Sequence, residues 1–266
     1  MDQGMKPDRP SSRGPSTATP RPRTTGHGVA RVLSKLGYAS RSESERLVRD
    51  GRVSVNGRVV TDPEHRTDAS RDRIAVDGTP VGAVEPVYLM LNKPRGLVTT
   101  RDDPQGRPTV YSCLEELDLP HVAPVGRLDK ASEGLLLFTN DTVWANAVLD
   151  GEHAPHKTYD VQIDTVPDDD LLARLCLPVD DGGQTLAARS VELLRHGQRN
   201  AWLRIVLDEG RNRHIRRLLA AHDIATLRLV RVAIGELELG ALEKGRTRLL
   251  TPDEISALRA GRRRRA

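Results

Sequence analysis

The segment PVGRLDKASEGLLLFTND, residues 124–141, holds the carboxylate with the most suggestive chemical setting. Asp129 stands between a loop shaped by Pro124 and Gly126 and an apolar run typical of a buried strand. A carboxylate beside a dry core can be desolvated and preorganised for catalysis. Capping and turn roles are commoner for a single loop aspartate. Glu133 supplies a second carboxylate, as glycoside hydrolysis requires, but sugar-stacking aromatics are not indicated.

An aromatic ring and a basic cluster occur in two later segments. Tyr159 lies in HKTYDVQID. It is either a tyrosine packed at the edge of the core or a platform on which a base stacks, an interaction worth about 1–3 kcal/mol per base. The segment 207–222 turns from a strand into a helix and carries four arginines: Arg211, Arg213, Arg216 and Arg217. A helix N-terminus is already positive, so these cations repel one another unless anions balance them. Phosphates or a carboxylate fit that role; an exposed basic helix with screened charges is the alternative.

The elements around these segments indicate an α+β domain. We expect strands at 88–92, 97–100, 135–138, 158–164 and 201–207. The first two are predicted to pair across the turn 93–96, and LLLF at 135–138 is expected to be covered on both faces. Helical periodicity follows at 213–222. Because strands outnumber helices and hairpins are frequent, the sequence predicts a largely antiparallel mixed sheet.

Residues 28–78 form a separate pattern, a small helical/β module. Apolar residues recur at helical spacing from Val29 to Leu36, and Gly37 is a plausible stop. Ser40 and Glu43 fit a capping box that opens a second helix. The dipeptide Asn56-Gly57 predicts a tight hairpin turn. Residues 79–87, with two prolines and a glycine, resemble a linker.

Composition excludes several classes of protein. The tails 1–27 and 259–266 carry a net charge of +8 and the rest of the chain −4, so any polyanion site must be a local patch. The N-terminal tail is too polar to fold and is expected to be disordered. We find no apolar run long enough for a membrane span and no secretory signal. Two cysteines provide neither a disulfide framework nor a zinc site, which indicates a reducing cytoplasm.

The module resembles the alpha-L RNA-binding fold, which occurs in a small-subunit ribosomal protein and in many RNA-modifying enzymes. The resemblance lies in VARVLSKLGYASRSESERLVRDGRVSVNG. Charge alone would favour a solvated face, since acidic residues are interspersed. The resemblance implies that four arginines face RNA phosphates: Arg41, Arg46, Arg49 and Arg52.

The remaining motifs resemble the RsuA/RluB branch of RNA pseudouridine synthases. They are NKPRGLVTT, then GRLD with GLLLFTND, then K-x-Y, then EGRNRHIRRL, and they span residues 28 to about 250 together with the module. The EGRNR sequence is more similar to the motif of the large-subunit rRNA enzymes than to that of the small-subunit one. Lys130-Ala131-Ser132 departs from the family, which often has an acidic residue and Thr there, and this puts a role for Ser132 in doubt.

The resemblance implies a reaction and a set of roles. The N1–C1′ bond of a uridine is cleaved, and the base turns while bound and rejoins through C5, with no cofactor or metal. Asp129 is the essential group, paired with Arg216. Tyr159 packs on the target base and Ile215 completes the pocket floor. Arg127 holds the flipped nucleotide or a phosphate, and Arg213 belongs to the phosphate-binding cluster.

These observations predict a monomeric cytoplasmic isomerase that acts on ribosomal RNA, 23S in preference to 16S. The predicted domains are a disordered basic tail (1–27), an RNA-binding module (28–78), a linker (79–87), a catalytic domain (88–258) and a basic tail (259–266). The alternatives are a 16S rRNA pseudouridine synthase and a non-catalytic RNA-binding ribosome-assembly protein. The segment 124–141 distinguishes the enzyme from the binder, because pure binding gives no reason for it.

Overall fold

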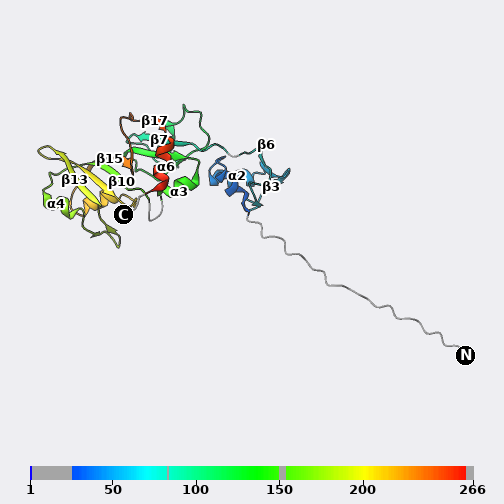
Figure 1. The fold of residues 1–266 in the computed structure, drawn as a ribbon, viewed down its shortest axis with the longest axis horizontal. Helices are drawn as coiled ribbons and strands as arrows, with labels where there is room; N and C mark the ends of the chain where they lie inside the picture. The colour runs from blue at the N-terminus through cyan, green and yellow to red at the C-terminus, as the bar shows by residue number, and fades with distance from the viewer. Residues whose placement is uncertain (2–25, 83, 150–153, 262–266) are drawn as a thin grey trace.

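The computed structural model describes residues 1, 26–82, 84–149 and 154–261, and Figure 1 shows a small N-terminal module beside a larger sheet domain. Most of the two tails for which we predicted disorder or a basic arm lies outside the described residues. No helix in the described ranges is long and apolar enough to cross a membrane.

The module packs two short helices on a small sheet around its own core. Leu33, Val48 and Val53 are fully buried at its centre. The sheet order is β3-β2-β5-β6, and β1 pairs with β4. The elements are β1 (His27–Gly28), α1 (Val29–Lys35), α2 (Arg41–Arg49), β2 (Val53–Val55), β3 (Arg58–Val60), β4 (Arg66–Thr67), β5 (Ile74–Val76) and β6 (Thr79–Pro80).

Local sequence signals explain most of the module. Asn56 and Gly57 both have positive φ, +53° and +79°, as the predicted tight hairpin between β2 and β3 requires. Ser40 Oγ accepts the backbone N–H of Glu43 at 3.1 Å, which caps α2. Only this half of the predicted capping box forms, because the Glu43 carboxylate accepts from the Arg46 guanidinium at 2.7 Å. The helix start is therefore as predicted, but its acidic partner faces outward.

The larger domain is built on a nine-stranded sheet with the main order β13-β14-β10-β15-β9-β7-β17. Only β9 and β15 pair in parallel; the remaining pairs in this sheet are antiparallel, as predicted. Its strands are β7 (Tyr88–Lys93), β8 (Ala123–Val125), β9 (Glu133–Thr139), β10 (Lys157–Ile163), β13 (Ser190–His196), β14 (Ala201–Leu207), β15 (Thr226–Ile234), β16 (Leu237–Glu238) and β17 (Thr247–Leu249), with β11 (Val179–Asp180) and β12 (Thr185–Leu186) as a separate pair. Its helices are η1 (Val110–Cys113), α3 (Thr142–Leu149), α4 (Asp169–Arg174), α5 (His214–Ala220) and α6 (Pro252–Ala260).

Strand β9 lies between two hydrophobic cores, as its continuous apolar run predicted. Leu136 and Phe138 belong to the core that α5 covers, whereas Leu135 and Leu137 belong to the one that α3 and α6 cover. All of its residues are buried. The segment that carries Asp129 runs directly into this strand, so the loop is attached to a strand whose residues are all buried.

One predicted strand is absent. Residues 97–100 do not pair with β7, whose partners are β9 and β17. The segment uses its polar groups elsewhere: Gly96 N–H donates to Lys130 O at 2.8 Å, and Thr99 Oγ1 donates to Leu128 O at 2.7 Å. The prediction failed because it assumed a local hairpin where the chain makes long-range contacts to the Asp129 loop.

The segment 84–87 connects the two parts through specific hydrogen bonds. Val84 N–H donates to Leu36 O of the module at 3.2 Å. Val87 N–H donates to the Asn140 side-chain oxygen at 2.8 Å, and the Asn140 amide donates to Glu85 O at 3.0 Å. The predicted linker is therefore anchored at both ends, and its first residues belong to β6.

Candidate active site

A cavity of about 520 Å³ opens between the Asp129 loop, β10, β15 and the turn before α5. Asp129, Tyr159 and Ile215, which the sequence singled out from three distant segments, all line it. Arg127, Arg213 and Arg216 line it as well. The fold thus brings together the predicted residues of the larger domain.

The backbone of the Asp129 loop is held from several sides. Gly126, with φ of +74°, permits the turn that enters it. Ser132 N–H donates to Asp129 O at 2.9 Å, which closes a turn before β9. The 96–99 segment contacts the carbonyls of Leu128 and Lys130, as described above. These bonds fix the loop independently of the Asp129 side chain.

Lys93, at the end of β7, is a further support that the sequence did not single out. Its side chain is fully buried, and Nζ donates to three carbonyl oxygens: those of Pro94 at 3.1 Å, Asp129 at 3.2 Å and Ser132 at 2.8 Å. Burial lowers the pKa of Lys93 to about 8, although Glu133 and Asp129 oppose this shift. The buried ammonium therefore ties both ends of the Asp129 loop to β7.

The cation nearest the Asp129 carboxylate is Arg213. Its Nη1 lies 3.7 Å from Asp129 Oδ2, and both side chains are partly exposed, 53% and 39%. We predicted this pairing for Arg216, and among the described residues no ion pair joins Arg216 to Asp129. Arg213 has φ of +50° and precedes α5, so it lies in the turn rather than in the helix. Among the described residues, Arg213, which directly precedes the helix that begins at His214, is the arginine within ion-pair distance of the carboxylate.

Arg216 lies just beyond the ion pair. Its guanidinium donates to Ala131 O and Thr226 O, both at the long distance of 3.4 Å, and Nε has no hydrogen-bond partner. Burial and the neighbouring Arg213 lower the pKa of Arg216, while Asp129 opposes the shift. Long contacts and an unused donor leave Arg216 free to take a closer anionic partner.

Tyr159 and Ile215 form the aromatic and apolar parts of the cavity wall. Tyr159, on β10, is 8% exposed, and Ile215, on α5, is 3% exposed. Both belong to the core that lies under the cavity. A flat ring set between buried neighbours has few rotamers, which suits a fixed platform for a planar base.

The cavity has an excess of positive charge. Arg127, Arg211 and Arg213 are exposed at its edge, while Lys157 and Arg231 are buried in its wall. Its acidic groups are Asp129 and Glu209, and Glu209 is already paired with Arg211. Such a surface raises the local concentration of polyanions.

Glu133 takes no part in this cavity. Its side chain is 4% exposed and binds Arg228 at 2.7 Å and Lys244 at 2.5 Å. Burial raises the pKa of Glu133, but the hydrogen bonds from Arg228 and Lys244 outweigh it and the pKa is lowered. Glu133 is a structural ion-pair centre, which removes the carboxylate pair that glycoside hydrolysis would need.

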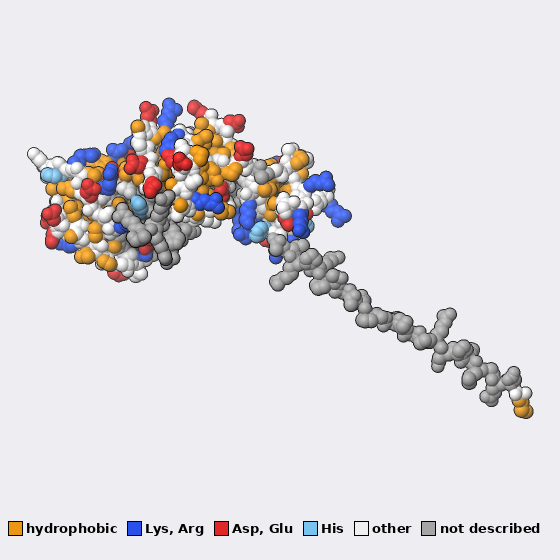
Figure 2. All heavy atoms as spheres, in the orientation of Figure 1, with side chains coloured by type: hydrophobic (Ala, Val, Ile, Leu, Met, Phe, Trp, Pro, Cys, Tyr) orange, Lys and Arg blue, Asp and Glu red, His pale blue; other side chains and the backbone are white. Residues whose placement is uncertain are grey.

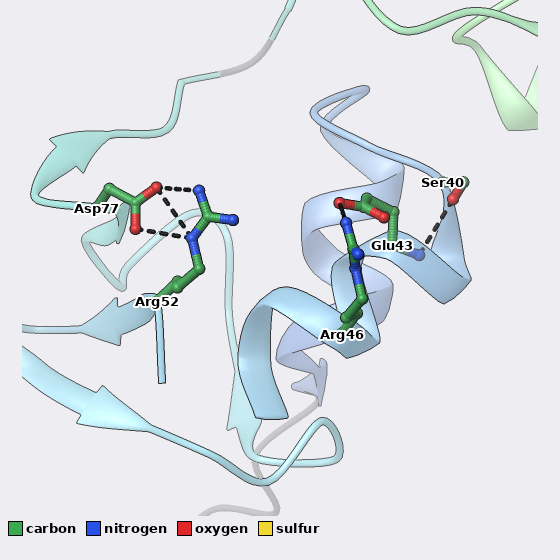
Figure 3. Close-up of polar contacts among 5 residues, drawn as sticks. All are labelled: Ser40, Glu43, Arg46, Arg52 and Asp77. Carbon is green, nitrogen blue, oxygen red and sulfur yellow. Dashed lines mark hydrogen bonds and ion pairs between the residues drawn. The ribbon is translucent and has the colours of Figure 1, made fainter. Parts of the chain in front are cut away.

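The four arginines predicted to face RNA lie on the module and are all ion-paired. Arg46 pairs with Glu43, and Arg52 makes a bidentate contact with Asp77 (Figure 3). Arg41 and Arg49 both contact Glu45, at 3.4 and 3.1 Å. Figure 2 shows several Lys and Arg side chains on one face of the module. Exposed pairs of this kind contribute little to stability, so phosphates can replace the carboxylates.

Sequence reasoning missed three residues of the site: Lys93, His214 and Arg231. Lys93 lies inside the NKPRGLVTT motif, which supported the family resemblance but to whose individual residues we assigned no role. Arg231 follows Leu229 at the alternating spacing of an inward-facing strand, so its burial was readable from the pattern. Both ring nitrogens of His214 lack a hydrogen-bond partner, and burial lowers its pKa. Within the described ranges, no group of His, Cys, Asp and Glu is arranged to hold a metal.

An acidic group among arginines, beside a buried ring and next to a basic module, suits an enzyme that acts on RNA. A family model described as RNA pseudouridylate synthase matches residues 87–221, and an S4 domain model matches residues 29–74. The chain therefore belongs to the RNA pseudouridylate synthase family and carries an N-terminal S4 domain. Its members are isomerases, and the predicted resemblance of both segments is confirmed.

Individual relatives of the chain are also named as pseudouridine synthases. The chain is 34% identical to the ribosomal large subunit pseudouridine synthase B of Bacillus subtilis (strain 168), over 87% of this chain and 95% of the relative. It is 38% identical to an uncharacterized RNA pseudouridine synthase of Mycobacterium tuberculosis (strain ATCC 25618 / H37Rv), over 88% and 93%. A solved crystal structure of a pseudouridylate synthase superposes with a TM-score of 0.61 at 27% identity, covering 87% of this chain and 99% of that one.

Proposed function

We propose that this protein converts a uridine of large-subunit (23S) rRNA into pseudouridine, with Asp129 as the essential group. The observation that carries the proposal is the position of Asp129, the carboxylate in a cationic cavity beside the buried ring of Tyr159. Relatives in Bacillus subtilis, Yersinia pestis and Pseudomonas aeruginosa are named ribosomal large subunit pseudouridine synthase B, which supports the large subunit over the small one. We place the reaction in the cytoplasm and expect a monomer.

The residues of the cavity have separate roles in the isomerisation. Extrusion of the uridine costs a few kcal/mol, and stacking on Tyr159 offsets part of that cost. Ile215 closes the apolar floor under the base. Asp129 acts at the ribose while the N1–C1′ bond breaks, either by attack on C1′ or by taking a proton from C2′. Arg213, whose Nη1 lies 3.7 Å from Asp129 Oδ2, and Arg216, with its unused Nε, orient the carboxylate and balance its negative charge.

The exposed arginines bind the rest of the RNA. Arg127, at the cavity edge, takes the phosphate of the flipped nucleotide or its neighbour. On the module, phosphates displace the acidic partners of Arg41, Arg46, Arg49 and Arg52. We further propose the predicted division of the chain into a module, a linker that ends at residue 87 and a catalytic domain (88–258), with the module extended from residue 78 to Pro80 because β6 pairs with β5.

The test is pseudouridine mapping across the rRNA of cells whose chromosomal gene for the protein is deleted and which express wild type or a variant from a plasmid. Wild type restores one modified site in 23S rRNA, whereas Asp129→Asn restores none although it binds rRNA normally. The matched control is Asp118→Asn, an exposed acid outside the cavity, which restores the site. Restoration by Asp129→Asn contradicts the role of Asp129, and a restored site in 16S rRNA contradicts the choice of subunit.

A further inference from the structure

Arg231 is a buried cation with no acidic partner among the described residues. It lies on β15, is 5% exposed and lines the cavity. Its Nε donates to Leu135 O at 2.7 Å, but its Nη2 has no hydrogen-bond partner. In the sheet register it stands directly opposite Tyr159 on the neighbouring strand. Facing side chains at such positions have Cβ atoms about 4.5–5.5 Å apart, and both residues line the cavity.

The surrounding backbone fixes Arg231 in place. Gly134 of β9 has φ of +100°, and a Cβ there would lie 2.2 Å from Arg231 O. The absent side chain lets β9 and β15 approach closely, with Arg231 paired to Gly134 in the parallel ladder. The Arg231 backbone therefore cannot shift readily, which is what a preorganised charge requires.

A contribution to folding stability does not explain why an arginine is buried at position 231. Burying an unpaired ion costs several kcal/mol, and an apolar side chain of similar volume usually stabilises such a position. Arg228, on the same strand but on the opposite face, shows the usual solution, since it is bound twice by Glu133. Arg231 instead keeps unsatisfied hydrogen-bonding capacity inside the cavity, so an anionic or strongly polar ligand group is expected there.

The position of Arg231 favours the base over a phosphate as that ligand. The arginines at the cavity edge, Arg127, Arg211 and Arg213, are exposed and can meet the RNA backbone. Arg231 is buried and adjoins Tyr159, where the proposed function puts the uracil ring. Heterolysis of the N1–C1′ bond leaves the electron pair on the base, so the detached uracil is an anion with charge on N1, O2 and O4.

We propose that Arg231 is a catalytic residue that stabilises this uracil anion. This inference rests on the proposed function. The anion exists between cleavage of N1–C1′ and formation of C5–C1′. When the new bond forms, C5 loses its proton and N1 gains one, so the product is an isomer and no co-reactant is consumed. The charge of Arg231 acts only while the base is detached, which is the condition for raising kcat rather than affinity.

The experiment measures single-turnover cleavage of the N-glycosidic bond in an rRNA fragment by nucleoside digestion and mass spectrometry. Arg231→Gln removes the charge but keeps an amide donor for Leu135 O. We expect its rate on uridine to fall about 10²–10³-fold, as when one oxyanion donor is lost, with unchanged RNA affinity. Arg231→Lys retains the charge and recovers part of the rate. In RNA with 5-fluorouridine at the target, the fall is smaller, because fluorine itself stabilises the anion.

Controls separate this inference from simpler readings. Arg204→Gln, on β14 and paired with Asp160 outside the cavity, retains the wild-type rate. Equal losses on both substrates with a weaker salt dependence of binding would identify a phosphate contact and overturn the proposal. Equal losses in the Gln and Lys variants, or none in either, overturn it as well. If wild type itself forms no pseudouridine, the proposed function has failed, which is a different result.

Discussion

The buried Lys93 ammonium gives the sharpest quantitative prediction for the active-site scaffold. Lys93→Met removes the donor shared by the carbonyls of Pro94, Asp129 and Ser132. Asp129 O still accepts the N–H of Ser132, so two of these acceptors are left unpaired, at a cost of about 1–3 kcal/mol each. Against this, the variant no longer buries a charge whose pKa falls from 10.5 to about 8, which returns about 3 kcal/mol. The net loss in the free energy of unfolding at neutral pH is therefore about 1 kcal/mol.

Thermal unfolding followed by circular dichroism measures this loss. For a chain of this size it corresponds to a fall in Tm of about 2–4 °C. The control is Lys130→Met, an exposed lysine on the same loop, whose Tm stays at the wild-type value. A wild-type Tm for Lys93→Met would refute the view that this ammonium holds the Asp129 loop.

The same residue predicts a pH dependence with a definite sign. The pKa of Lys93 is lower in the folded state than its ordinary value of 10.5, so between about pH 8 and 10.5 the unfolded chain binds more protons. Wild-type stability from this group is flat below about pH 8 and rises above it, by ~2 kcal/mol at about pH 9.5. Lys93→Met lacks the rise, so the stability gap widens with pH. If the difference in free energy of unfolding between wild type and Lys93→Met narrows as the pH rises, Lys93 is not a buried cation.

Three further predictions test the other groups. Tyr159→Ala is expected to lower turnover more than Tyr159→Phe, because the ring and not the hydroxyl supports the base; equal losses contradict stacking. Arg213→Gly relieves the φ of +50° and is expected to raise stability by about 1 kcal/mol while lowering the rate of pseudouridine formation; a lower Tm with a wild-type rate contradicts the pairing with Asp129. Arg52→Gln is expected to weaken rRNA binding and to reduce the slope of log affinity against log salt by about one; an unchanged slope indicates that Arg52 serves only Asp77.

Features that depend on neighbouring residues could be predicted from the sequence. The hairpin at Asn56-Gly57 needs positive φ at both positions, and that requirement is readable in the residue types. The double burial of β9 follows from its apolar run. Asp129, Tyr159 and Ile215 line one cavity, as the resemblance to a family with ordered motifs implied.

Features set by distant contacts were not predictable in this way. The strand expected at 97–100 failed because Thr99 and Gly96 bond to a loop about 30 residues away. Arg213 replaces Arg216 beside Asp129, in an ion pair that joins two distant segments.

The supports of Asp129 differ between its backbone and its side chain, and the difference is chemically sensible. The backbone of its loop is fixed by the buried Lys93 and by Thr99 through hydrogen bonds of 3.2 and 2.7 Å. The carboxylate has, in the part of the chain that the structure describes, only the partly exposed Arg213 at 3.7 Å, with Arg216 incompletely bonded nearby. A tightly paired carboxylate would have to lose its partner before acting on a ribose, whereas a loosely paired one on a rigid loop can exchange partners as the nucleotide enters. Contacts at catalytic groups often shorten only in the substrate complex, so the long distances in this cavity fit a site that closes around its RNA.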